Sequence, residues 1–171
     1  MNNINELATE RLILRPWRES DFTCFFEFFS DETTSKYVGG IQTEEEAWRL
    51  MASYIGHWQL KGFGYLAVDE KTTGEFVGCV GLWKSPPWPK IELGYWFIEK
   101  KQGQGFATGA AIKLKQFAFE ELKVDTLVSY IDPGYIASKR VAKRIGGVKE
   151  KTIELLDYGP HEVYRYKYVV T

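Results

Sequence analysis

The stretch IELGYWFIEKKQGQGFATGA, residues 91–110, decides the fold. Its first part predicts a strand over residues 90–98, and its second part opens a helix that runs to about Lys123. Between them, Gly103 and Gly105 let several backbone N–H groups point at one place with no Cβ in the way. The positive N-terminal end of the helix adds to that field, so the turn predicts a site for phosphate oxygens.

Two common phosphate-binding motifs do not fit this turn. The P-loop of NTPases ends in Gly-Lys-Ser/Thr, which the turn lacks, and the dinucleotide-binding motif needs a third glycine where this chain has Thr108. A bare Gly-x-Gly also serves ordinary tight turns. Taken alone, the turn leaves both anion binding and a purely structural role open.

Outward from this stretch, the hydrophobic periodicity predicts a single mixed α+β domain over residues 1–171. About four flanking helices are expected, beginning near Asp21, Thr43, Gln104 and Ile136. The central sheet is expected to be mixed but mostly antiparallel, because its middle strands read as a meander. About seven strands are expected, at residues 9–16, 63–68, 76–83, 90–98, 126–130, 152–156 and 163–170.

Composition narrows the classes of partner. The chain has 22 Lys+Arg against 23 Asp+Glu and a formal net charge of −1, which argues against a nucleic-acid partner. No signal peptide, lipidation motif or membrane-spanning run is read, so we expect a cytoplasmic protein with no membrane partner. Cys24 and Cys79 have no metal or redox spacing, so no metal is expected.

The near-neutral total hides a local imbalance of charge. Residues 1–92 hold 9 basic and 14 acidic side chains, a balance of −5, whereas residues 93–171 hold 13 basic and 9 acidic side chains, a balance of +4. The later half therefore suits an anionic ligand, although scattered surface charge gives the same counts.

Six ordered blocks of the sequence resemble one known family. The run from Gln102 to Ala107 is similar to the Gln/Arg-x-x-Gly-x-Gly/Ala signature of the GNAT superfamily of acyl-CoA-dependent N-acetyltransferases. The other blocks resemble its RimJ/RimL branch, whose best-known members acetylate the N-termini of ribosomal proteins. These blocks are residues 9–16, Asp21, 73–78, 92–96, and 137–141 with 145–146. The resemblance covers nearly the whole chain and implies the GNAT fold, in which one parallel pair of strands splays apart.

The resemblance also implies acetyl-CoA as cosubstrate, in a cleft where the strands at 90–98 and 126–130 separate. Backbone groups of Trp96, Phe97 and Ile98 would pair with its pantetheine arm like an added strand. The pyrophosphate would lie on the backbone of the turn, at Gln102, Gly103, Gln104, Gly105, Phe106, Ala107 and Thr108. The candidates for the 3′-phosphate are Lys100, Lys101, Lys139, Arg140 and Lys143.

Acyl transfer to an amine needs a base for the amine and a proton for the departing thiolate. The resemblance makes Glu92 the candidate base, and burial that raises its pKa would suit that role. The alternative is that Glu92 pairs with an arginine or accepts backbone bonds. Ser138 and Tyr135 are the candidate proton donors, with Ser138 placed to meet the sulfur. The family usually shows Asn-x-x-Ser here, and Tyr135 stands in place of the Asn, so both residues also read as a helix cap or as packing.

Three functions stay open on the sequence alone. The leading hypothesis is an acetyl-CoA-dependent N-acetyltransferase that acts on a primary amine by direct attack in a ternary complex. A second is a non-catalytic CoA-binding protein with a sensing or regulatory role, which the missing Asn motivates. A third is a regulator that binds another nucleotide on the same turn.

The acceptor is the least determined partner, and both a protein N-terminus and a small-molecule amine fit. The acids Asp31, Glu32 and 44–46 suit a cationic amine, and helix capping explains them equally well. Around the proline-rich segment 85–89, several aromatic residues predict an apolar wall of the acceptor site or the face of a homodimer, while simple core packing accounts for at least half of them. These residues are Trp83, Trp88, Tyr95 and Trp96.

Overall fold

A computed structural model gives the architecture of the chain and describes residues 6–169. The strands are β1 (Leu7–Ala8), β2 (Leu12–Arg15), β3 (Tyr65–Glu70), β4 (Phe76–Trp83), β5 (Glu92–Phe97), β6 (Leu127–Ile131), β7 (Val148–Glu154) and β8 (Pro160–Tyr166). The helices are α1 (Phe22–Ser30), α2 (Glu32–Ser35), α3 (Glu44–Lys61), α4 (Phe106–Gln116) and α5 (Ile136–Arg144). The short helical turns are η1 (Glu19–Asp21), η2 (Glu99–Lys101), η3 (Phe117–Glu121) and η4 (Leu156–Tyr158).

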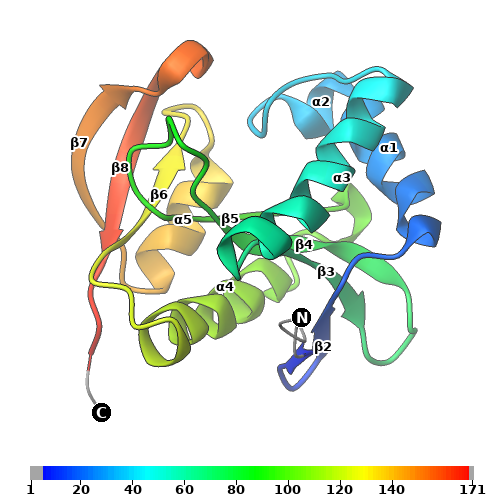
Figure 1. The fold of residues 1–171 in the computed structure, drawn as a ribbon, viewed down its shortest axis with the longest axis horizontal. Coiled ribbons are helices and arrows are strands. Elements are labelled where there is room, and N and C mark those ends of the chain that lie inside the picture. Colours follow the sequence, from blue (N-terminus) through cyan, green and yellow to red (C-terminus); the bar gives the residue numbers. More distant parts are fainter. Residues whose placement is uncertain (1–5, 170–171) are drawn as a thin grey trace.

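Within residues 6–169 the eight strands form one open sheet in the order β1-β2-β3-β4-β5-β6-β8-β7 (Figure 1). Neighbouring strands are antiparallel except β5 and β6, which run parallel. The meander from β3 to β5 is the one that the sequence predicted, and the mixed, mostly antiparallel fold class is confirmed. No helix in this part of the chain is both long and apolar enough to cross a membrane.

Several elements differ from the sequence-based prediction. β1, with two residues, and α2, with four, are additional. β7 begins at Val148 instead of residue 152, and β8 at Pro160 instead of residue 163. β7 is an edge strand whose residues are almost all exposed, so it lacks the apolar alternation that marks a half-buried strand. The end expected for the last strand, residue 170, lies outside the described residues.

The chain passes from α5 into β7 through a tight turn at Gly147. Its backbone N–H donates to the carbonyl of Ala142 at 2.7 Å. A Cβ at this position would lie 2.8 Å from that carbonyl oxygen and 2.9 Å from the Tyr166 ring, so a side chain does not fit. The glycine therefore allows β7 to start directly after the helix, earlier than the charge-rich sequence suggests.

The two faces of the sheet carry separate apolar clusters. On one face, α4 buries Phe106, Ala110, Ala111 and Leu114 against the strands. On the other face lies the aromatic stripe of α1, which the sequence predicted as core, and Phe28 stacks on Trp96 of β5 with ring centroids 4.1 Å apart. Figure 1 shows α1, α2 and α3 together on the side of the sheet away from α4. β5 is therefore covered on both faces, with its end directed at the start of α4.

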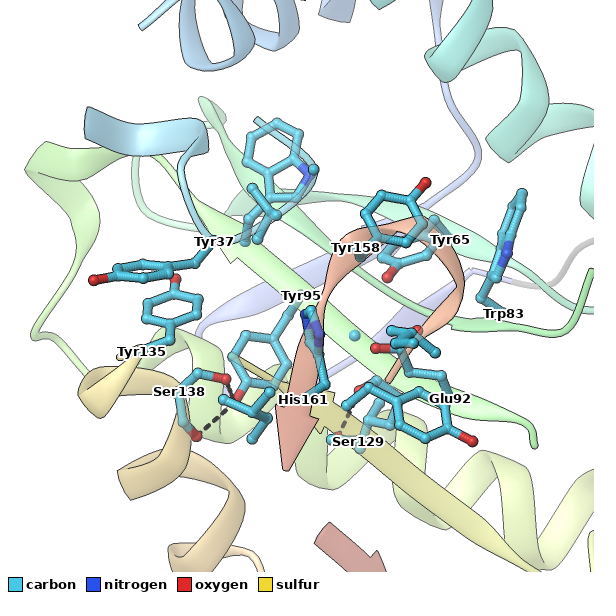
Figure 2. A pocket seen from close by; sticks show the side chains of 18 of the residues that line it. Tyr37, Tyr65, Trp83, Glu92, Tyr95, Ser129, Tyr135, Ser138, Tyr158 and His161 are labelled. Atoms are coloured by element: carbon cyan, nitrogen blue, oxygen red, sulfur yellow. Dashed lines mark hydrogen bonds between the residues drawn. The ribbon is translucent and has the colours of Figure 1, made fainter. Parts of the chain in front are cut away.

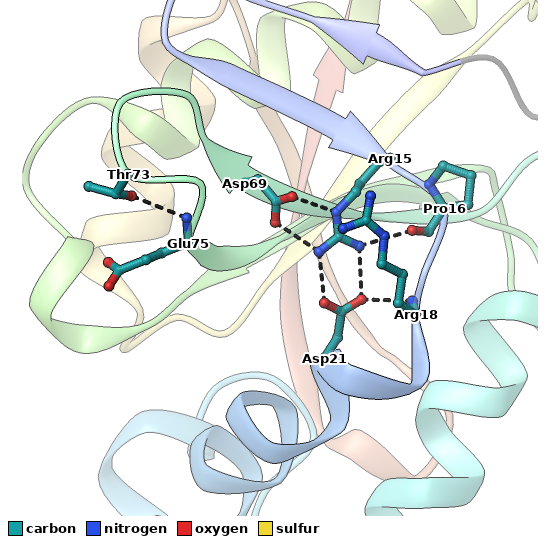
Figure 3. A network of polar contacts seen from close by, with 7 residues as sticks. All are labelled: Arg15, Pro16, Arg18, Asp21, Asp69, Thr73 and Glu75. Carbon is teal, nitrogen blue, oxygen red and sulfur yellow. Dashed lines mark hydrogen bonds and ion pairs between the residues drawn. The ribbon is translucent and has the colours of Figure 1, made fainter.

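A buried ion-pair network joins β2 and β3 to the start of α1 (Figure 3). Arg15 on β2 binds both carboxylate oxygens of Asp69 on β3, at 2.6 and 2.8 Å, and both oxygens of Asp21 in η1, at 2.7 and 2.9 Å. All three side chains are largely buried. Burial by itself would lower the pKa of Arg15, but the bonds to the two carboxylates outweigh it and raise that pKa.

We expect Arg15→Leu to destabilise the fold by about 3–5 kcal/mol, because it leaves two buried carboxylates without a cation. Arg49→Leu is the matched control, since Arg49 pairs with Glu45 in an exposed i,i+4 contact on α3, for which a cost of about 0.5 kcal/mol or less is typical. Urea unfolding followed by circular dichroism measures both. Equal losses in the two variants would show that the buried network does not hold η1 on the sheet.

Candidate active site

The site begins where β5 and β6 separate. The parallel ladder pairs Glu92 with Val128, and the Val128 N–H donates to the Ile91 carbonyl at 3.1 Å. One residue further on, the Ser129 hydroxyl donates to the Leu93 carbonyl at 2.6 Å and lies 2.8 Å from the Tyr166 hydroxyl. A side chain thus occupies the acceptor that the next ladder bond would use. The rest of β5 runs on beside a gap.

Along β5, the backbone N–H and C=O groups of successive residues point alternately toward this gap and toward β4. The Ile98 N–H donates to the Val77 carbonyl at 3.0 Å, and the Ile98 carbonyl accepts from the Lys101 N–H at 2.9 Å, so both backbone groups of Ile98 already have partners within the chain. By the alternation of a strand, the amide of Trp96 also points to β4, while those of Tyr95 and Phe97 point to the gap. The Phe97 carbonyl accepts from the Gln102 side chain at 2.9 Å, which leaves the Phe97 N–H toward the gap.

The glycine turn forms one wall of a cavity of about 250 Å³ at the end of this gap. Gly103 and Gly105 have φ of +73° and +81°, the left-handed conformation that the sequence predicted. From β1–β2, Arg11 donates to the Gln104 carbonyl at 2.6 Å and lies over the Phe106 ring, which holds the turn in place. The lining includes the predicted residues Trp96, Phe97, Gln102, Gly103, Gly105, Phe106, Ala107, Thr108 and Ser138. Gln104 is not part of this lining.

The basic side chains at this cavity are only partly those expected. Lys139 does not line it, because its ammonium donates to the Pro133 carbonyl at 2.9 Å and lies 3.5 Å from a carboxylate oxygen of Glu162. Of the expected basic residues, Lys101 and Arg140 line it, together with Arg144 on α5, which the sequence did not single out. The i,i+4 spacing of Arg140 and Arg144 puts both on one face of α5. Left-handed glycines, a helix N-terminus and two guanidinium groups make a cradle that fits a diphosphate.

A second cavity, of about 310 Å³, lies on the other side of the gap (Figure 2). Its walls come from α3, the proline-rich loop, β5, β6, η4 and the segment after α2. Aromatic side chains dominate the lining, and they include the four that the sequence singled out. They are Tyr37, Tyr54, Tyr65, Trp83, Trp88, Tyr95, Trp96, Tyr130, Tyr135 and Tyr158.

Glu92 is the carboxylate of this second cavity. The indole N–H of Trp88 donates to its Oε2 at 2.8 Å, and no Arg or Lys within residues 6–169 forms an ion pair with it. Burial raises the pKa of Glu92 to about 8, although the hydrogen bonds from Trp88 and the Tyr130 backbone act in the opposite direction. The arginine partner considered from the sequence is therefore not found, and Glu92 is a group that changes charge near neutral pH.

Four residues line both cavities and so mark their junction: Tyr95, Trp96, Tyr135 and Ser138. The Tyr95 hydroxyl donates to the Ser138 carbonyl at 3.1 Å and lies 3.1 Å from the Ser138 hydroxyl. Tyr135 stacks on Tyr37 with ring centroids 4.7 Å apart, and burial raises its pKa. The sequence pointed to Ser138 and Tyr135 but not to the contact with Tyr95, which depends on how α5 packs against β5.

Comparisons with known proteins agree with this geometry. A family model described as the acetyltransferase (GNAT) domain matches residues 11–148. The uncharacterized protein YkkB of Bacillus subtilis (strain 168) is 31% identical over 161 residues, which are 90% of this chain and 91% of YkkB. An acetyltransferase from Agrobacterium tumefaciens str. C58 is 36% identical, with a TM-score of 0.90 over 98% of this chain and 97% of that chain.

The chain belongs to the GNAT acetyltransferase family and is an acetyl-CoA-dependent N-acetyltransferase by class. RimL, a ribosomal L7/L12 alpha-N-protein acetyltransferase in complex with coenzyme A, is 19% identical, with a TM-score of 0.78 over 95% of this chain and 97% of that chain, and shares the fold. In the described part of this chain, no group of three or more His, Cys, Asp or Glu side chains is arranged to hold a metal ion.

The hydrogen bond from the Trp88 indole to Glu92 lowers the pKa of the Glu92 carboxyl group, and this effect can be tested. Removing the bond in Trp88→Phe should raise the Glu92 pKa from about 8 by about one unit, since a hydrogen bond to a charged group contributes about 1.5–3 kcal/mol. The ¹³C shift of the labelled Glu92 carboxyl group, followed against pH, measures it. Trp48→Phe is the control, because Trp48 packs edge-on against Phe22 and does not line this cavity. An unchanged titration in Trp88→Phe would contradict the bond.

Proposed function

We propose that this protein acetylates the primary amine of a protein N-terminus or a small molecule by direct attack on acetyl-CoA in a ternary complex. The observation that supports this most is the meeting of two cavities at Tyr95, Trp96, Tyr135 and Ser138. One cavity carries the cradle for phosphates, and the other carries a carboxylate with a pKa near 8. An amine in the second cavity would therefore reach a thioester held in the first.

The cofactor side of the proposal uses the residues of the first cavity. We assign the pyrophosphate to the backbone of the turn from Gln102 to Thr108 and the further phosphate to Arg140 and Arg144. The Phe97 N–H, which points to the gap, would bind and polarise the thioester carbonyl as the oxyanion forms. Acetyl-CoA would supply the activated acetyl group, and the residues of this cavity would hold that group beside the amine.

Glu92 is the proposed general base. An alkylammonium loses its proton before it attacks, and a carboxylate whose pKa lies near the working pH is suited to accept that proton, directly or through a water molecule. The aromatic walls that surround Glu92 keep the carboxyl group partly away from bulk water, which is the cause of its raised pKa. Trp88 orients the carboxyl group through its indole N–H.

For the departing thiolate, the contacts favour Ser138 as the proton donor. Its hydroxyl lies 3.1 Å from the hydroxyl of Tyr95, so the two form a short relay at the junction of the cavities. Tyr135 stands where the family usually has Asn and is held flat against Tyr37. We assign Tyr135 a role in shaping the junction and assign the proton to the Tyr95–Ser138 pair.

Glu92→Gln tests the base. In the parent, kcat/KM should rise with pH through an apparent pKa of about 8, because only the ionised carboxylate accepts the proton. The variant should lose about 10²-fold or more of the rate and this acid limb. Thiol release from acetyl-CoA across a panel of amines is the readout, and Glu150→Gln, which changes an exposed carboxylate paired with Arg165, should keep the parent profile.

Two results would contradict the proposal, one from that assay and one from thermal unfolding with CoA or ATP present. CoA binding without thiol release for any amine would support a non-catalytic CoA-binding protein instead. Stronger thermal protection by ATP than by CoA would support a regulator that binds another nucleotide.

Gly103→Asp tests the phosphate cradle. The new carboxylate would repel the phosphates, so the Kd for CoA should rise about 10-fold or more, as titration calorimetry can measure. Gly74→Asp is the matched control. Both glycines have a similar positive φ, +73° and +70°, and open space for a Cβ, but Gly74 lies in the turn between β3 and β4. If the two variants lose CoA affinity equally, the cradle is misplaced.

The remaining partners stay predictions from the sequence. The aromatic side chains near the proline-rich loop line the second cavity, which supports the acceptor wall over the face of a homodimer. We also propose that the protein is cytoplasmic, a location in which its proposed cosubstrate acetyl-CoA would be available.

A further inference from the structure

We infer that the acceptor is a small primary monoamine whose body is a flat aromatic group. This inference rests on the proposed function and names the chemical class that the second cavity selects. Three features of that cavity carry it: its charge, its size and the arrangement of its rings around Glu92.

The charge of the cavity fits one ammonium group. Among the lining residues that the structure describes, Glu92 is the one carboxylate. None of the acidic residues that the sequence offered for a cationic acceptor lines this cavity, and three of them have partners elsewhere. Asp31 accepts from the backbone of α2, Glu46 accepts from the backbone of Thr43 at the start of α3, and Glu45 pairs with Arg49. A polyamine would therefore place its second and third charges against aromatic rings and phenols with no carboxylate to meet them.

The size of the cavity fits a compact body. Its volume of about 310 Å³ lies at the lower end of the range typical of small-molecule sites, about 300–1,000 Å³. A protein N-terminus needs room for several residues and backbone partners for their amide groups. Of the two residues at which β5 leaves its backbone edge free, Phe97 lines the cofactor cavity alone and Tyr95 lies at the junction, so this edge offers the second cavity few partners for a peptide.

The rings near Glu92 form a corner that fits a flat group. Trp88 stands edge-on to Tyr130 and to Tyr158, with interplanar angles of 76° and 70° and centroids 6.3 and 5.8 Å apart. Figure 2 shows Tyr158 and Trp83 near the Glu92 end, with Tyr135 and Ser138 at the opposite end. An ammonium between these ends would be attracted by both the carboxylate and the ring faces, and an aromatic body would pack among the rings.

Tyr158 makes this arrangement testable without removing a core residue. It belongs to the short turn η4 and lines the cavity, and it is 55% exposed to solvent. Tyr158→Ala should therefore remove one wall of the ring corner and leave the fold and Glu92 in place. Tyr168→Ala is the matched control, because Tyr168 is 50% exposed and packs on Phe119 away from both cavities.

The experiment compares 2-phenylethylamine, ethylamine, spermidine and a tripeptide with a free N-terminus, with thiol release from acetyl-CoA as the readout. We expect kcat/KM for 2-phenylethylamine to exceed those of the other three at least 10-fold. Tyr158→Ala should raise KM for 2-phenylethylamine at least fivefold, with little change in kcat and little change for ethylamine. Tyr168→Ala should match the parent for all four amines.

Each failure has its own meaning. Faster acetylation of spermidine or of the tripeptide would overturn the monoamine class while leaving the acetyltransferase function in place. An equal loss for 2-phenylethylamine and ethylamine in Tyr158→Ala would overturn the ring contact. No transfer to any of the four amines, with CoA still bound, would overturn both this inference and the proposed function.

Discussion

The site depends on one displaced hydrogen bond in the sheet. After Glu92 and Val128 pair, the Ser129 hydroxyl takes the Leu93 carbonyl, and β5 and β6 part. The groups to which we assign catalysis and cofactor binding lie along the gap that this creates. The Phe97 amide faces it, the turn after β5 closes its far end, and Glu92 stands at its near end, where the ladder stops. A continuous ladder would satisfy these backbone groups internally and leave no cleft between the strands.

The same strand also sets the relation between the two halves of the site. β5 carries Glu92 at its first residue and leads into Gly103 and Gly105 through η2, so the proposed base and the proposed phosphate cradle belong to one segment, whose strand is covered on both faces. The buried network of Arg15, Asp21 and Asp69 fixes the start of α1 on the neighbouring part of the sheet. α1 in turn supplies Phe28, on which Trp96 of β5 stacks.

Much of this arrangement follows from local patterns in the sequence. The meander, the long helices and the glycine turn have strong signatures, and the family motif points to Glu92 and Ser138. Features that depend on packing between distant segments are different. The start of β7 was placed too late because an exposed edge strand carries little periodicity. The sequence offers both Lys139 and Arg140 as cofactor ligands, but consecutive helix residues point about 100° apart, and it is Arg140, with Arg144, that lines the cavity. The Trp88–Glu92 and Tyr95–Ser138 contacts have no sequence signal beyond the residues themselves.

The two cavities draw on different parts of the chain. The proposed cofactor cavity is lined by β5, the turn, the start of α4 and α5, and all of its lining residues lie between residues 95 and 144. In the proposed acceptor cavity, part of the wall is formed by three segments that are far apart in the sequence, at residues 37–42, 83–88 and 155–161. Surface segments tolerate insertion and replacement far better than a covered strand and the helix it leads into. Selectivity for the amine is thus free to diverge by exchange of short loops while the acetyl donor stays the same, and grafting these three segments is the natural route to redirecting the enzyme.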